Sequence, residues 1–182
     1  MLLLILGVAL WWASHLFKRI APGPRARMGD AGRGMVTAGL LLSIVLMVIG
    51  YRATGGPYWW GATGATKGIN NLLMLIAVYL FAASGMKTRA ARVIRHPMLT
   101  GFALWAFAHL LPNGDLPSFV LFGGLLAWAL VEIAVLNRAQ PGWTPPPPAP
   151  MRKEMMAIAG TVIVYAVMAL VHIWLGYNPF GA

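Results

Sequence analysis

Four histidines stand inside or at the edge of long apolar segments, where a polar side chain is costly to bury. They are His15, His96, His109 and His172. Imidazole ligates iron, copper and zinc, and it also transfers protons near neutral pH. A simpler interpretation of each histidine is a hydrogen bond to a neighbouring helix. Because the apolar segments hold few other polar residues, the four together indicate a site more strongly than any single one.

Membrane-spanning helices are the elements expected to position these histidines. Of the 182 residues, 59% are hydrophobic and only 10% are charged, a charged fraction far below that of a soluble domain. A chain this short cannot bury so much apolar surface in one water-soluble core, so lipid is the expected solvent. Six apolar runs predict an all-α integral membrane fold, a six-transmembrane-helix bundle forming one domain over residues 1–182. The predicted spans are 2–17, 35–51, 69–86, 98–111, 119–136 and 156–175.

The charged residues indicate how these helices are oriented. The chain has 14 Lys or Arg against 4 Asp or Glu, a net charge of +10, and the cations lie between the apolar runs. That placement is typical of topology signals and lipid-headgroup contacts, and it argues against a nucleic-acid partner. The first, third and fifth connections carry five, four and three cations, the second carries two, and the fourth carries none. Because basic loops stay in the cytoplasm, both termini are predicted to be non-cytoplasmic.

Several chemistries are excluded or disfavoured by the sequence. The chain has no cysteine, which rules out disulfides, thiolate metal sites and cysteine nucleophiles. Its serines do not stand in a nucleophile elbow, and its glycine clusters lack the spacing of a phosphate-binding loop. The proline-rich stretch 141–150 predicts a stiff, extended connector in the fifth loop.

The polar residues at membrane depth fall into two layers when about 1.5 Å is counted per helical residue. The layer near the cytoplasmic ends contains His15, His96 and Glu132. The layer near the outer ends contains His109, His172 and Asn70 or Asn71, with Asn113 and Asp115 close by. The sequence therefore predicts that histidines from distant spans share a depth.

The stretch from Arg95 to Asp115 resembles the central signature of the NnrU family. It reads Arg-His-Pro-Met-Leu-Thr-Gly from Arg95, Trp-Ala-Phe-Ala-His-Leu-Leu from Trp105, and Asn-Gly-Asp from Asn113. The first span ends in Ser-His-Leu and the last in His-Ile-Trp-Leu-Gly, which also resemble the family, although Ile173 stands where proline is expected. The resemblance covers nearly the whole chain.

The resemblance implies a protein of the bacterial inner (plasma) membrane, linked to denitrification and nitric oxide metabolism. Plant and cyanobacterial relatives are cis-zeta-carotene isomerases that carry haem b, so the resemblance implies haem b here. His15 and His109 match the ligand-bearing motifs of those relatives. Two axial nitrogens on one iron lie about 4 Å apart, yet His15 and His109 fall in different layers. His172, at the depth of His109, is therefore the substitute partner.

Four further residues are expected to serve this site. Arg95 and His96 are assigned to a haem propionate or a lipid headgroup at the inner face, on charge and position. Asn113 and Asp115 are assigned to the outer end of the fourth span, where they cap the helix or orient His109.

The leading hypothesis is a haem b protein that acts on or senses a small apolar molecule or nitric oxide, alone, as a homo-oligomer or in a membrane complex. Whether it is an enzyme stays open; polyene isomerisation is one version. A second hypothesis is a lipid or isoprenylcysteine-type methyltransferase, because the Arg-His-Pro of Arg95–Pro97 also occurs in their signature. Against it, Glu132 is the only late acidic residue at membrane depth. A third is a non-catalytic membrane subunit or assembly factor, in which the histidines are structural.

Overall fold

Helices make up nearly all of the regular structure, because backbone groups in lipid must form their hydrogen bonds internally. The computed structural model describes residues 1–181. Within them, five helical stretches are long and apolar enough to cross a membrane. They are α1 (Leu2–Ile20), α3 (Ala31–Arg52), α4 (Gly64–Met86), the stretch Leu116–Ala139 and α9 (Met151–Trp174). The prediction of a helical membrane protein is confirmed at this level.

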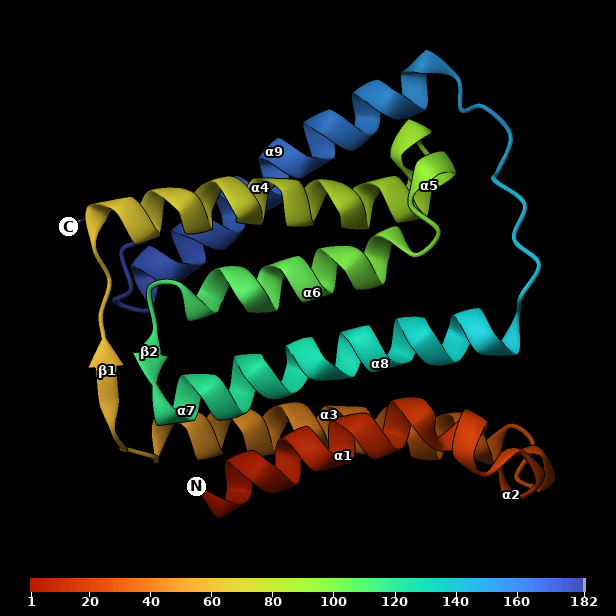
Figure 1. The fold of residues 1–182 in the computed structure, drawn as a ribbon, viewed down its shortest axis with the longest axis horizontal. Helices are drawn as coiled ribbons and strands as arrows, with labels where there is room; N and C mark the ends of the chain where they lie inside the picture. The colour runs from red at the N-terminus through yellow and green to blue at the C-terminus, as the bar shows by residue number, and fades with distance from the viewer. Residues whose placement is uncertain (182) are drawn as a thin grey trace.

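The fourth predicted span, 98–111, corresponds to a shorter apolar helix, α6 (Pro97–Leu110). Its 14 residues extend over about 21 Å, less than the roughly 30 Å of a hydrocarbon core. Proline explains both limits, since Pro97 begins the helix and Pro112 follows its end. In Figure 1, α6 runs between α4 and the stretch that contains α8 (Gly124–Ala139), and it packs on both.

The two ends of the bundle differ in content (Figure 1). One end, here called the basic end, carries α2 (Pro22–Arg27), α5 (Arg89–Val93) and the extended 140–150 connector. The other, called the terminal end, carries both chain termini and the strands β1 (Tyr58–Trp60) and β2 (Gly114–Asp115). The first, third and fifth connections therefore meet at the basic end, as their cation content predicts.

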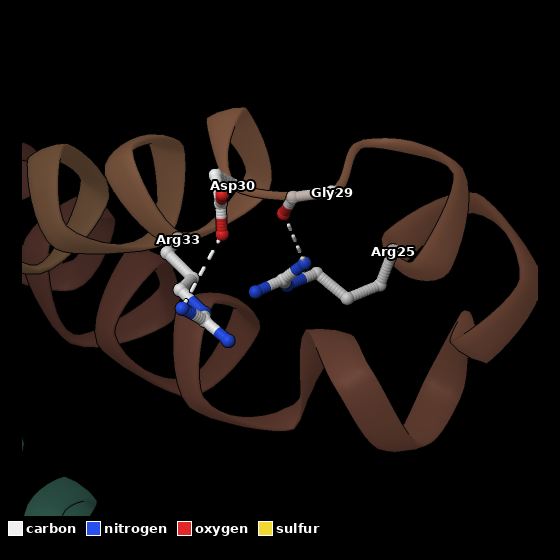
Figure 2. Close-up of polar contacts among 4 residues, drawn as sticks. All are labelled: Arg25, Gly29, Asp30 and Arg33. Carbon is white, nitrogen blue, oxygen red and sulfur yellow. Dashed lines mark hydrogen bonds and ion pairs between the residues drawn. The ribbon is translucent and has the colours of Figure 1, made fainter.

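The first connection keeps most of its charge available at the basic end. Figure 2 shows the Arg33 guanidinium 3.3 Å from the Asp30 carboxylate, and Arg25 donating to the Gly29 carbonyl at 3.2 Å. Arg33 and Asp30 form the one ion pair found among residues 1–181, and both side chains are almost fully exposed. Exposed pairs of this kind contribute little to stability. The cations of the first connection therefore remain suited to contact anionic lipid headgroups.

The terminal end contains a two-stranded antiparallel sheet that the sequence did not predict. Tyr58 pairs with Asp115 and Trp60 with Gly114. The Trp60 indole donates to the Leu111 carbonyl at 3.0 Å, and a Cβ at Gly114 would collide with that indole ring. Strands of two or three residues show no period-two alternation, so no sequence pattern reveals them. The sheet ties the connection before α4 to the end of α6.

Small residues let the helices approach closely, as is common where lipid supplies no hydrophobic drive for helix association. At Gly50 of α3, an added Cβ would lie 2.7 Å from the Leu4 Cα of α1. At Gly101 of α6, it would lie 2.8 Å from the Ala77 carbonyl of α4. α9 packs mainly on α4 and leaves most of its apolar surface exposed, which fits a lipid-facing helix.

The stretch Leu116–Ala139 is not uniformly α-helical. It comprises α7 (Leu116–Ser118), the π-helical turn η1 (Phe119–Gly123) and α8. The Asp115 carboxylate accepts a hydrogen bond from the Ser118 backbone N–H at 2.8 Å and so caps the start of α7. π-helical turns are rare in proteins. Where they occur, they often lie at functional sites.

Candidate histidine site

His109 and His172 lie next to each other at the terminal end of the bundle. Their ring centroids are 6.4 Å apart, with the ring planes inclined by 43°. His109 stands in the last turn of α6 and His172 in the last turn of α9. Both helices run from the basic end to the terminal end (Figure 1), so their last turns reach the same level.

A hydrogen bond to a backbone carbonyl within its own helix sets the tautomer of each ring. His109 Nδ1–H donates to the Trp105 carbonyl at 2.9 Å, and His172 Nδ1–H donates to the Met168 carbonyl at 2.7 Å. A carbonyl oxygen only accepts, so in the neutral ring the proton sits on Nδ1 and the lone pair on Nε2. Nε2 with a lone pair, oriented by a bond at Nδ1, is the form in which histidine ligates metals.

Aromatic rings surround His109 on the bundle side. Phe122 stacks on it, with centroids 4.8 Å apart and planes 28° apart, and Trp105 lies at 5.3 Å. Phe122 is buried and belongs to η1, so the π-helical turn places it on the imidazole. Sequence reasoning did not find Phe122, since a π turn has no recognised sequence pattern.

Three adjoining cavities lie at or next to the histidine pair. An outer cavity of about 480 Å³ and a small one of about 60 Å³ are both lined by His109 and His172. A deeper cavity of about 310 Å³ shares Met74 and Met168 with the small one. The deeper walls are apolar, whereas the outer cavity also meets Lys67 and several Asn side chains. The site thus changes from apolar to polar toward the terminal end.

The polar rim of the site contains an acceptor without a partner. Asn70 Oδ1 is buried and has no hydrogen bond among residues 1–181, and Asn70 lines both histidine cavities. Leaving such an atom unpaired costs on the order of 1–3 kcal/mol. Its neighbour Asn71 donates to the Pro179 carbonyl at 2.9 Å, which holds the segment after α9 over the site. The rim is therefore polar and incompletely satisfied, as expected where a ligand binds.

His15 belongs to a different group of rings. Its centroid lies 4.3 Å from Trp11 and 4.4 Å from Trp128, and its Nδ1–H donates to the Trp11 carbonyl at 3.0 Å. It has the same tautomer as the other two, but it lines none of the three cavities described. The structure therefore groups His109 with His172, the substitute partner, and places His15 against the tryptophans.

Arg95 and His96 lie at the basic end, away from the histidine pair. His96 Nε2–H donates to Asn137 Oδ1 at 3.0 Å, and Arg95 donates to the Gln140 carbonyl. These contacts tie the start of α6 to the end of α8. His96 thus differs from the other histidines, because its Nε2 already has a partner.

Asn113 is the remaining expected residue that reaches the site. Its side-chain N–H donates to the His109 carbonyl at 2.8 Å, and Asn113 lines the outer cavity. Asp115, by contrast, bonds the Ser118 N–H at the start of α7.

The ligand set of the site is small. Residues 1–181 contain no group of three or more His, Cys, Asp or Glu side chains that could hold a metal ion. Two imidazoles are instead the number of protein ligands that a metal needs when a macrocycle supplies the rest.

A bundle of long apolar helices, with two neighbouring histidines at one end, is the architecture of a helical membrane protein. The chain matches the family described as NnrU protein over residues 3–179, and it belongs to that family. No curated protein and no solved structure matches it.

Proposed function

We propose that this NnrU-family protein binds haem b between His109 and His172 in the bacterial inner membrane. The proposal rests on the 6.4 Å separation of the two ring centroids. Because metal–nitrogen bonds are about 2 Å long, two imidazoles at this separation could both hold one iron. The Nδ1 bonds to Trp105 and Met168 leave both Nε2 atoms available as ligands.

The surroundings of the pair support an amphipathic macrocycle. Met74, Trp105 and Met168 line the deep cavity and offer an apolar wall. The outer cavity adds a cation and amide groups, which suit carboxylates. When bound, haem would supply an iron that exchanges electrons, and that could take a diatomic ligand only where one of the two imidazoles is released. The chain's own part would be to fix both imidazoles and, through Phe122 and Trp105, to cover His109 on its bundle side.

We also propose that α6 crosses the membrane as a sixth span, with the basic end cytoplasmic and both termini outside. The clustering of the first, third and fifth connections at the basic end supports this orientation. The histidine pair then lies near the outer surface of the membrane.

Besides haem b, we propose that the protein binds a small apolar molecule or nitric oxide. Roles in denitrification and in polyene isomerisation both stay open. A further cavity of about 470 Å³ supports an apolar ligand, because its walls include Trp11, Met47 and Leu125. It shares Tyr51 and Tyr177 with the outer histidine cavity, so a molecule held there lies beside the histidine pair.

The absorption spectrum of the protein purified in detergent tests the proposal. We expect a Soret band typical of two axial imidazoles, lost in His109→Ala and in His172→Ala. His96→Ala is the matched control, because His96 lies at the other end, and its spectrum should match that of the wild type. A spectrum lost in His15→Ala but kept in His172→Ala would reassign the second ligand to His15. A colourless protein that binds a methyl donor would favour the methyltransferase, and one that binds neither would favour a structural subunit.

A further inference from the structure

We propose that Lys67 binds a carboxylate of the ligand held at the histidine pair, so that an amphipathic ligand sits with its anionic edge toward the terminal end. The inference rests on the proposed function, in which the ligand is haem b and the carboxylates are its propionates. It replaces Arg95 and His96, which lie at the opposite end, as the propionate partners.

Lys67 is placed for this contact by the start of α4. It lies in the first turns of that helix, is half-buried, and lines the outer cavity together with His109 and His172. None of the residues that line this cavity is acidic. Its ammonium donates to the Gly181 backbone carbonyl, a neutral acceptor. A carboxylate is a stronger acceptor for an ammonium, because the hydrogen bond is then charge-assisted at both ends.

The distribution of charge over the molecule points to the same residue. Lys67 and Arg52 are the two cations outside the first, third and fifth connections. Both line cavities at the terminal end: Lys67 the histidine cavity, and Arg52 the apolar cavity beside it. Cations on the non-cytoplasmic side weaken the charge asymmetry that orients a membrane protein. Two exceptions that both meet ligand-sized cavities indicate a role in binding an anion.

Haem b and its dimethyl ester separate the carboxylate contact from iron ligation, because esterification removes the negative charges and leaves the iron unchanged. The apoprotein in detergent is titrated with each compound. We expect Lys67→Met to weaken binding of haem b by about tenfold, the effect of one charge-assisted hydrogen bond, and to leave binding of the ester unchanged. Lys67→Arg should behave as the wild type. Lys153→Met, an exposed lysine at the basic end, is the matched control and should change neither.

The outcomes distinguish failure of this inference from failure of haem binding. If the wild type binds both compounds and Lys67→Met weakens neither, or weakens both equally, the carboxylate contact is overturned while haem binding stands. If the wild type binds neither compound, both proposals are overturned. His109→Ala should lose both compounds, because it removes an iron ligand and not a carboxylate partner.

Discussion

Phe122 stacks on His109 with ring centroids 4.8 Å apart, and it reaches that position from a π-helical turn. The same ring lies 5.4 Å from Trp105 and 6.2 Å from Tyr51, so it joins α6 to α3. The imidazole is thus fixed by its Nδ1 bond and by an aromatic neighbour. A side chain held on two sides keeps its Nε2 in one direction, which a metal ligand requires.

Phe122→Ala should destabilise the folded protein by about 3 kcal/mol, because it removes a buried aromatic ring and leaves a cavity. The measurement is thermal unfolding in detergent, followed by circular dichroism. Phe107→Ala is the matched control on α6, where the ring is 46% exposed on the outer surface of the bundle. Its loss should change the melting temperature little. Equal effects of the two substitutions would contradict the packing role of Phe122.

Gly50→Leu should disrupt the contact between α3 and α1. Any Cβ at this position lies within 3 Å of the Leu3 and Leu4 backbone, which cannot move without shifting the helix. Overpacking of this kind typically costs about 1–3 kcal/mol, so we expect a lower melting temperature and faster proteolysis. Gly160→Leu on α9 meets open space and should have little effect. An unchanged Gly50→Leu protein would show that the two helices are not in close contact.

Glu154→Ala should loosen the basic end. The Glu154 carboxylate is buried and accepts a hydrogen bond from the Arg89 backbone N–H at 2.8 Å, which joins the start of α9 to α5. Removing it leaves that N–H without its acceptor and should cost about 1–3 kcal/mol. Asp30→Ala, which removes an exposed carboxylate, is the control and should be nearly neutral. If both changes had the same effect on the unfolding free energy, Glu154 would not be a structural link.

The proposed orientation can be tested by labelling, because the chain has no cysteine of its own. Single cysteines are introduced by Gly55→Cys at the terminal end and Gly142→Cys at the basic end; both sites are exposed. A membrane-impermeant maleimide should label Gly55→Cys in intact spheroplasts and label Gly142→Cys only after lysis. The opposite labelling pattern would show that the protein has the reverse orientation, with the histidine pair at the cytoplasmic surface.

The sequence by itself predicted the long apolar helices, the alternation of cation-rich and cation-poor connections, and the common level of His109 and His172. These are local properties: a span needs a run of apolar residues, and depth follows from a fixed rise per residue. The outer layer predicted for His109 and His172 agrees with their 6.4 Å separation. The proline limits that shorten α6 could also be read locally.

Only the tertiary structure decided that His109 lies beside His172, that His15 lies against Trp11 and Trp128, and that Lys67 reaches the same cavity. Each of these depends on how one helix is rotated against another. That rotation is set by close contacts between residues far apart in the chain, such as Gly101 with the Ala77 carbonyl. The pairing of the strands at Trp60 and Gly114 likewise depends on residues far apart in the chain. Apolar periodicity reports which face of a helix avoids water, but when lipid covers the outside it does not report which helix is the neighbour.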